Sequence, residues 1–169
     1  MAVKEVLLLG NPKLYEVSTL ANADDMKELR HVVNDLHGTL MDFRDRYERG
    51  RAIAAPQIGV MKRLIYMHIE EPVIFVNPVI KDKSREMMLV WDDCMCFPDL
   101  LVRVERHKTC SILYRDMDWK ECELKLEGNL SELLQHEFDH LDGILATSRA
   151  INGHAFALTS QEAYLTYDS

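Results

Sequence analysis

Apolar positions divide the chain into a long helix, a run of strands and a second helix. Between Asp24 and Arg49 they recur at spacings of three and four residues, which predicts an amphipathic helix that Gly50 ends. Short apolar runs bounded by turn residues then predict strands at 63–69, 73–80, 87–97, 102–116 and 120–128. The last two are expected to form a pair joined by a turn near residues 116–119.

A second helix is expected to start near Asn129, where Glu132 three residues later resembles a capping box. After Gly143 the pattern weakens, and a short helix with a frayed tail is expected. Helix, several strands and helix in this order predict an α+β fold, with antiparallel or mixed strands packed around a central helix, and not an alternating parallel sheet.

Composition narrows the class of protein. The chain has 169 residues, of which 47% are hydrophobic and 28% charged, and this fits a single domain over residues 1–169. A net charge of −8 without a basic run argues against nucleic-acid binding. No stretch has the apolar length of a membrane helix or a secretory signal. The four cysteines lack the spacing of a secreted scaffold, so a reducing cytoplasm is expected.

Candidate chemistry lies on the second helix, in the stretch QHEFDH at 135–140. His136 and His140 are four residues apart, so both imidazoles project from one face and can share a cation. Glu137 falls in the apolar sector of the helix, where a carboxylate is costly unless a nearby dication compensates. Four polar residues fall in the opposite sector: Glu132, Gln135, Asp139 and Asp142.

A metal site with catalytic function needs a third protein ligand. The segment after His140 has no histidine at the spacing of a metzincin, and no glutamate occurs before Glu162. A zinc-protease interpretation therefore lacks its ligand. A soft donor upstream becomes the best candidate, and Cys94 and Cys96 in DDCMCF both remain open at this point.

Three motifs in chain order resemble the peptide deformylase family, which removes the N-formyl group from new polypeptides. The family patterns GxGxAAPQ, EGCxS and QHExDHLxG are matched by GRAIAAPQ at 50–57, DDCMC at 92–96 and QHEFDHLDG at 135–143. Similarity in the correct order extends from about Glu5 to Arg149. The resemblance implies an α+β fold with a central helix that carries the two histidines.

By position, the resemblance implies that Cys94, His136 and His140 bind one divalent ion, Fe²⁺ or Zn²⁺, with water as a fourth ligand. Glu137 would act as general acid and base while the metal-activated water attacks the formyl carbon.

The resemblance also implies an oxyanion contact from the Gln57 side chain and the backbone N–H of Met95. The partner would be an N-formylated peptide or nascent chain in the cytoplasm, with association with the ribosome left open.

The same resemblance places the substrate against Gly50, Arg51, Ala52, Asp92, Asn129, Glu132 and Leu133. Several residues at or next to these positions depart from the family pattern. Ala52 and Asp93 replace glycines, Arg51 replaces an aliphatic residue, and Cys96 replaces a serine. Asn129 and Glu132 stand where the methionine pocket is usually apolar. We therefore expect the hydrolytic chemistry to be preserved and the recognition of formyl-methionine to be altered.

Two other functions remain open from the sequence. The chain could be an amidase or deacylase with another N-acyl substrate, or a metal-binding homologue without activity. The place of Cys96 is also open. If residues 94–96 continue a strand, its thiol points to the same side as that of Cys94. Packing or a local hydrogen bond is favoured over ligation, since a fourth protein ligand would close the water position.

Overall fold

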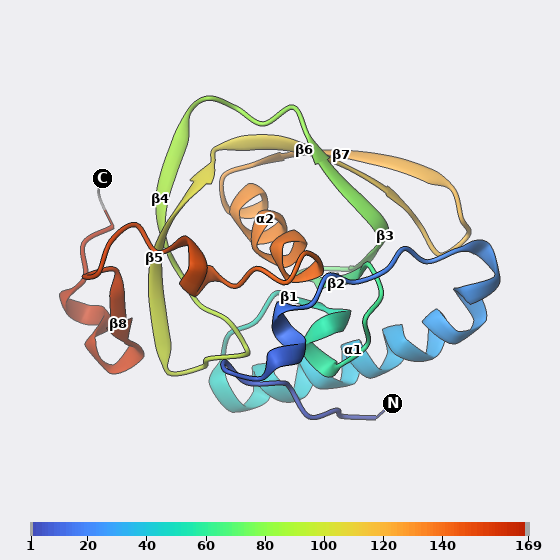
Figure 1. Cartoon of the computed structure of the whole chain (residues 1–169), viewed down its shortest axis with the longest axis horizontal. Coiled ribbons are helices and arrows are strands. Elements are labelled where there is room, and N and C mark those ends of the chain that lie inside the picture. The colour runs from blue at the N-terminus through green and yellow to red at the C-terminus, as the bar shows by residue number, and fades with distance from the viewer. Residues whose placement is uncertain (1, 168–169) are drawn as a thin grey trace.

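The structure, a computed structural model, describes residues 2–167 (Figure 1). Its helices are α1 (Met26–Tyr47) and α2 (Asn129–Leu141). Its strands are β1 (Ala52–Ala54), β2 (Leu64–His68), β3 (Pro72–Lys81), β4 (Met87–Asp92), β5 (Leu100–His107), β6 (Thr109–Arg115), β7 (Glu121–Glu127) and β8 (Phe156–Leu158). Short 3₁₀ helices are η1 (Pro12–Tyr15), η2 (Ala23–Asp25), η3 (Ala55–Ile58), η4 (Ala146–Arg149) and η5 (Thr159–Tyr164).

The strands form two antiparallel sheets. One has five strands in the order β1-β2-β3-β6-β7, and the other has three in the order β4-β5-β8. The helix α2 lies between them and contacts β1 and β7 of the larger sheet and β5 of the smaller one (Figure 1). The helix α1 packs against β1 and β2. The predicted α+β fold with a central helix is therefore confirmed.

The ends of α1 differ slightly from the prediction. The side chain of Asn22 accepts a hydrogen bond from the Asp24 amide, and Asp25 caps the Asn22 amide in return. This box starts a 3₁₀ turn, so α1 itself begins at Met26. At the other end the chain leaves the helix at Glu48, which has φ of 57°. Gly50, the expected terminator, comes two residues later with φ of 114°.

The single strand predicted over 102–116 is wrong, because it is two strands in different sheets. Strand β5 ends at His107 and β6 begins at Thr109. The peptide groups of Lys108, between them, are bonded elsewhere: its N–H donates to Glu86 and its carbonyl accepts from Gly128. The predicted pairing with 120–128 is confirmed, since β6 and β7 form an antiparallel pair.

The capping box predicted at Asn129 is also wrong. Gly128 is the N-cap of α2, and Asn129 is the first residue inside the helix. The Glu132 carboxylate accepts a hydrogen bond at 2.7 Å from Arg51 instead of capping the backbone. Gly128 has φ of 58°, a conformation that glycine adopts at low cost, so the turn from β7 selects the start of the helix.

The polar sector of α2 is largely buried, which the one-sided apolar pattern of this helix does not indicate. Glu132, Gln135 and Asp139 are each less than 9% exposed, while Asp142 is partly exposed. The reason is that sheets lie on both sides of the helix. Gln135, for example, exchanges hydrogen bonds with both backbone groups of His107 in β5.

Beyond Gly143 the chain forms η4, β8 and η5, so the weak pattern in the sequence concealed an edge strand as well as a short helix. Strand β8 pairs with β5 through Leu100–Val102. The last residues of the predicted frayed tail, 168–169, lie outside the described residues. Within residues 2–167, neither helix combines the length and the apolar composition that a bilayer crossing requires.

Candidate metal centre and active site

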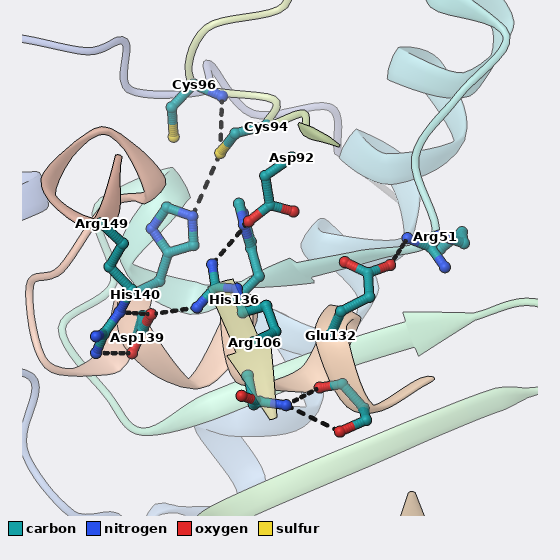
Figure 2. A network of polar contacts seen from close by, with 12 residues as sticks. Arg51, Asp92, Cys94, Cys96, Arg106, Glu132, His136, Asp139, His140 and Arg149 are labelled. Carbon is teal, nitrogen blue, oxygen red and sulfur yellow. Dashed lines mark hydrogen bonds and ion pairs between the residues drawn. The ribbon is translucent and has the colours of Figure 1, made fainter. Parts of the chain in front are cut away.

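Three side chains from two segments meet beside α2. One ligand atom each from Cys94, His136 and His140 lies within 4.8 Å of the others, and all three residues are buried. Helical spacing places the two imidazoles one turn apart, with ring centroids at 5.0 Å. The Cys94 Sγ approaches His140 Nε2 at 3.3 Å (Figure 2). The structure thus brings together the three residues that the sequence predicts as ligands.

The donor set fits one divalent cation. A thiolate and two neutral imidazoles suit Zn²⁺ or Fe²⁺. Nδ1 of His136 is hydrogen-bonded to Asp92 at 3.0 Å, which leaves Nε2 of this ring for an ion. Burial lowers the pKa of His140 well below its usual value, so this ring is a neutral donor. Burial raises the pKa of the Cys94 thiol, and the field of a dication opposes that effect by favouring the thiolate.

The segment that carries Cys94 is a turn and not a strand, so the predicted strand over 87–97 is wrong beyond Asp92. The Phe97 amide donates to the Cys94 carbonyl, which reverses the chain. Cys96 Sγ lies 3.4 Å from Nε2 of Gln57 and outside the group of three candidate ligands. The expectation that both thiols share one side of a strand therefore does not hold, although both lie near Gln57.

Asp92 connects His136 to a chain of charges that is buried except at Arg149 (Figure 2). Its Oδ2 also accepts from Arg106 at 2.7 Å, and Arg106 reaches Asp139 at 2.7 Å. Arg149 in turn donates to both oxygens of Asp139. Burial alone would raise the pKa of Asp92, but His136 and Arg106 together lower it to about 2. Asp92 is thus a charged acceptor that orients a candidate ligand, in addition to lining the cavity.

Sequence reasoning missed Arg106, Asp139 and Arg149 in this chain of charges. For Arg106 a signal was present: it alternates with Val102 and Val104, which places its side chain on their buried face of β5. For Asp139 the helical sector pointed the wrong way, because that sector faces the smaller sheet.

Glu137 lies alone among these groups. It is 4% exposed, and its Oε2 has no hydrogen-bond partner within residues 2–167. Burial raises the pKa of the carboxyl to about 7, although His136 acts in the opposite direction. A carboxyl that titrates near neutrality can both take and release a proton at working pH.

Gln57 presents its amide N–H₂ to the same place. The side chain is 1% exposed, and its Oε1 accepts from the Ala54 amide at 2.8 Å, which fixes the orientation of the group. Its Nε2 lies 3.6 Å from Cys94 Sγ. Met95, whose backbone N–H is the other predicted oxyanion donor, stands between the two cysteines of the turn and is also buried.

One cavity joins these groups to the predicted substrate residues. Cys94, His136, Glu137, Gln57 and Met95 line it. Six of the residues predicted to contact substrate also line it: Gly50, Arg51, Ala52, Asp92, Glu132 and Leu133. Asn129 does not, although its carbonyl lies 3.5 Å from Nη1 of Arg51. Phe43 of α1 and Asp93 are lining residues that were not among those predicted to contact substrate.

The chain matches a known family over most of its length. Residues 3–155 match the family model described as polypeptide deformylase. The chain belongs to the polypeptide deformylase family. It is 37% identical over 152 residues to the peptide deformylase of Pelagibacter ubique, covering 86% of this chain and 84% of that protein.

Solved peptide deformylases share the fold. The crystal structure of the enzyme from Thermotoga maritima superposes with a TM-score of 0.82 at 27% identity, covering 90% of this chain and all of that one. A class I type b peptide deformylase from Acinetobacter baumannii with bound Met-Ala-Ser gives a TM-score of 0.80 at 28% identity, covering 88% and 98%. Family membership, the α+β fold and hydrolase activity on N-formyl peptides thus agree with the motifs in the sequence.

Proposed function

We propose that the chain removes the formyl group from the amino terminus of polypeptides, with one Fe²⁺ or Zn²⁺ held by Cys94, His136 and His140. The observation that carries the proposal is the position of Glu137. Its carboxylate is buried without a partner for Oε2, in the same cavity as the candidate ligands. A lone buried carboxylate is costly for a protein that only binds a metal, and it is useful where a proton has to move.

The divalent ion, when bound, supplies Lewis acidity, since it lowers the pKa of a water to about 7 and polarises a carbonyl group. The protein supplies the rest. The Glu137 carboxylate accepts a proton from the attacking water and later gives it to the leaving amine nitrogen. Water adds to the formyl carbon and the C–N bond breaks, so the products are formate and a free amino terminus.

Two donors stabilise the charge that develops on the formyl oxygen. Nε2 of Gln57 lines the cavity in a fixed orientation, because the other end of its amide is held by Ala54, and it donates to the Cys94 and Cys96 sulfurs when no substrate is bound. The N–H of Met95 is proposed as the second donor, since the turn places this residue on the cavity wall. Donors fixed before the reaction cost no reorganisation when the charge appears.

The proposal extends to the setting of the reaction. All four cysteines are free thiols, which suits a reducing cytoplasm. The substrate is a formylated peptide or nascent chain, and association with the ribosome stays a prediction.

Formate release from formyl-Met-Ala-Ser tests the proposal directly. We expect the protein loaded with Fe²⁺ or Zn²⁺ to release formate, and Glu137→Gln to lose at least about 100-fold in kcat while it keeps one metal ion per chain. Glu123→Gln, on the far strand pair, is the matched control and should retain activity.

Three outcomes would contradict the proposal. One is a loaded protein that releases acetate from acetylated peptides but no formate from formylated ones. Another is a Glu137→Gln variant with full activity. The third is metal binding without release of any acyl group, which would indicate a homologue that only binds.

A further inference from the structure

An ion pair stands within the cavity that holds the candidate catalytic groups. Arg51 comes from the segment before β1, and Glu132 comes from the first turn of α2. Nη2 of Arg51 lies 2.7 Å from Oε1 of Glu132 (Figure 2). The Glu132 side chain is only 10% exposed and that of Arg51 is 40% exposed. Both residues line the same cavity as Cys94 and Glu137, so a group attached to the reacting formamide meets this pair.

The pair retains hydrogen-bonding capacity for a ligand. The contacts of Arg51 with Glu132 and with the Asn129 carbonyl use its two terminal nitrogens and one carboxylate oxygen. A guanidinium has five N–H donors and a carboxylate accepts at two oxygens. Both a donor and an acceptor therefore remain beside the reacting position.

This chemistry selects against some side chains. A thioether or alkyl group displaces water from the pair and returns no strong hydrogen bond. A cationic side chain offers donors to Glu132 but no acceptor to Arg51, and an anionic one offers acceptors to Arg51 but no donor to Glu132, so each satisfies only one partner. A neutral group with one acceptor and adjacent donors satisfies both partners, and a primary carboxamide has this form.

We propose that the Arg51–Glu132 pair makes this chain prefer formylated substrates whose first side chain ends in a carboxamide, such as glutamine, over those that begin with methionine. The carboxamide oxygen accepts from Arg51, and its N–H₂ donates to Glu132. This inference rests on the proposed function, because it concerns the residue that carries the formyl group. Glutamine and methionine have side chains of similar length, so the comparison isolates polarity from reach.

The test compares formyl-Gln-Ala-Ser with formyl-Met-Ala-Ser, together with the formyl-Lys and formyl-Glu tripeptides. We expect kcat/KM for the glutamine peptide to exceed that for methionine by at least about tenfold, since a polar site rejects an analogue that leaves its groups unpaired. Calorimetry with Glu137→Gln should give the same order of Kd values without turnover.

Substitution of both partners should reverse the order. In Arg51→Leu with Glu132→Leu, the cavity wall becomes apolar and methionine should be preferred. Lys81→Leu with Glu123→Leu removes an ion pair of 3.1 Å between β3 and β7, and it should leave the ratio of kcat/KM values unchanged. Glu132→Gln keeps the shape of the side chain and one acceptor oxygen. It should lower the ratio of kcat/KM for the glutamine peptide to that for the methionine peptide, and it provides this test even if the double variant folds poorly.

The outcomes separate the two proposals. Formate release that favours methionine, lysine or glutamate, or a ratio that the Arg51 and Glu132 substitutions do not move, would overturn the inference and leave the proposed function standing. Release of no formate from any of the four peptides would overturn both.

Discussion

The two histidines of α2 lie in different chemical environments, although they are only one helical turn apart. Nδ1 of His136 is held by Asp92, whereas Nδ1 of His140 is buried with no hydrogen-bond partner within residues 2–167. Burial lowers the pKa of both rings, but the Asp92 carboxylate overcomes this for His136 and raises its pKa to about 9. Metal binding to His136 therefore has to displace a proton, and Asp92 then orients the neutral ring.

Replacing Asp92 tests this orienting role. We expect Asp92→Asn to weaken metal binding by about 10- to 100-fold, because the ring loses its charged acceptor and Arg106 loses one of its two partners. Competition with a chelator measures the effect. Asp93→Asn is the matched control: Asp93 is partly exposed, its ion-pair partner is Arg49 at 3.9 Å, and its loss should change metal affinity little. Equal losses in the two variants would count against the role.

Substitutions of the two cysteines of DDCMCF should differ in their effect on metal binding. Cys94→Ser should lose the metal, because it removes the soft ligand of the cluster. Cys96→Ser should keep it, since Cys96 lies outside that cluster and contacts Gln57 instead. Metal content after dialysis, measured for both variants side by side, decides the point. Loss of the metal from Cys96→Ser to the same degree would show that Cys96 is a ligand.

At the level of elements, the spacing of residues within motifs predicted more of the candidate site than hydrophobic periodicity did. The two histidines and Glu137 could be singled out because helical geometry fixes where residues four apart project, whereas Cys94 was assigned through the resemblance to the family. The polar sector of α2 could not, because a periodicity argument assumes one buried face. Here both sides of the helix contact a sheet. Glu132 is hydrogen-bonded to Arg51, Gln135 to β5 and Asp139 to Arg149. Those partners lie outside the helix, between 10 and 81 residues away in the sequence, so the helical pattern does not record them.

The end of α2 also depends on a distant segment, η1. Gly143 has φ of 71°, and a Cβ on it would meet the backbone carbonyl of Tyr15. We expect Gly143→Ala to lower the free energy of unfolding by about 2–3 kcal/mol, because both the backbone conformation and the close approach resist a side chain. Denaturant titration measures it.

Gly153 provides the matched control for that substitution. A Cβ at Gly153 would have open space, and its φ is not in the left-handed region. Gly153→Ala should leave stability within about 0.5 kcal/mol of the parent. A Gly143→Ala protein as stable as Gly153→Ala would mean that the two segments separate without cost.

For the whole molecule, the amino-terminal segment links the parts of the site. The Leu7 amide donates to the Gln57 carbonyl, and the Leu9 amide donates to the Cys96 carbonyl at 2.9 Å. One stretch thus holds both Gln57, the proposed oxyanion donor, and the turn at residues 94–97. The sequence could not indicate this link, since backbone pairing of this kind leaves no side-chain signature. A single domain over residues 1–169 stays a prediction.

Removing one backbone donor tests this link. Leu9→Pro deletes the N–H that the Cys96 carbonyl uses, and we expect a loss of about 1–3 kcal/mol in stability with weaker metal retention. Leu9→Ala keeps the donor and removes a side chain that is 40% exposed, so it should have a small effect. Thermal melts and chelator competition on both variants give the comparison. Identical behaviour of the two would show that the hydrogen bond does not matter.

The position of α2 late in the chain has a consequence for biosynthesis. The groups of the site come from residues 57, 94–96 and 136–140, and both sheets pack on the helix that carries the last of these. A ribosome synthesises the chain from its amino terminus at about 5–20 residues per second. The two histidines therefore emerge from the ribosome seconds after the turn that carries Cys94. During that time the strands made earlier lack α2, the helix that lies between the two sheets. Unfinished chains lack two of the three candidate ligands, so we expect any uptake of a metal ion to follow translation of nearly the whole protein.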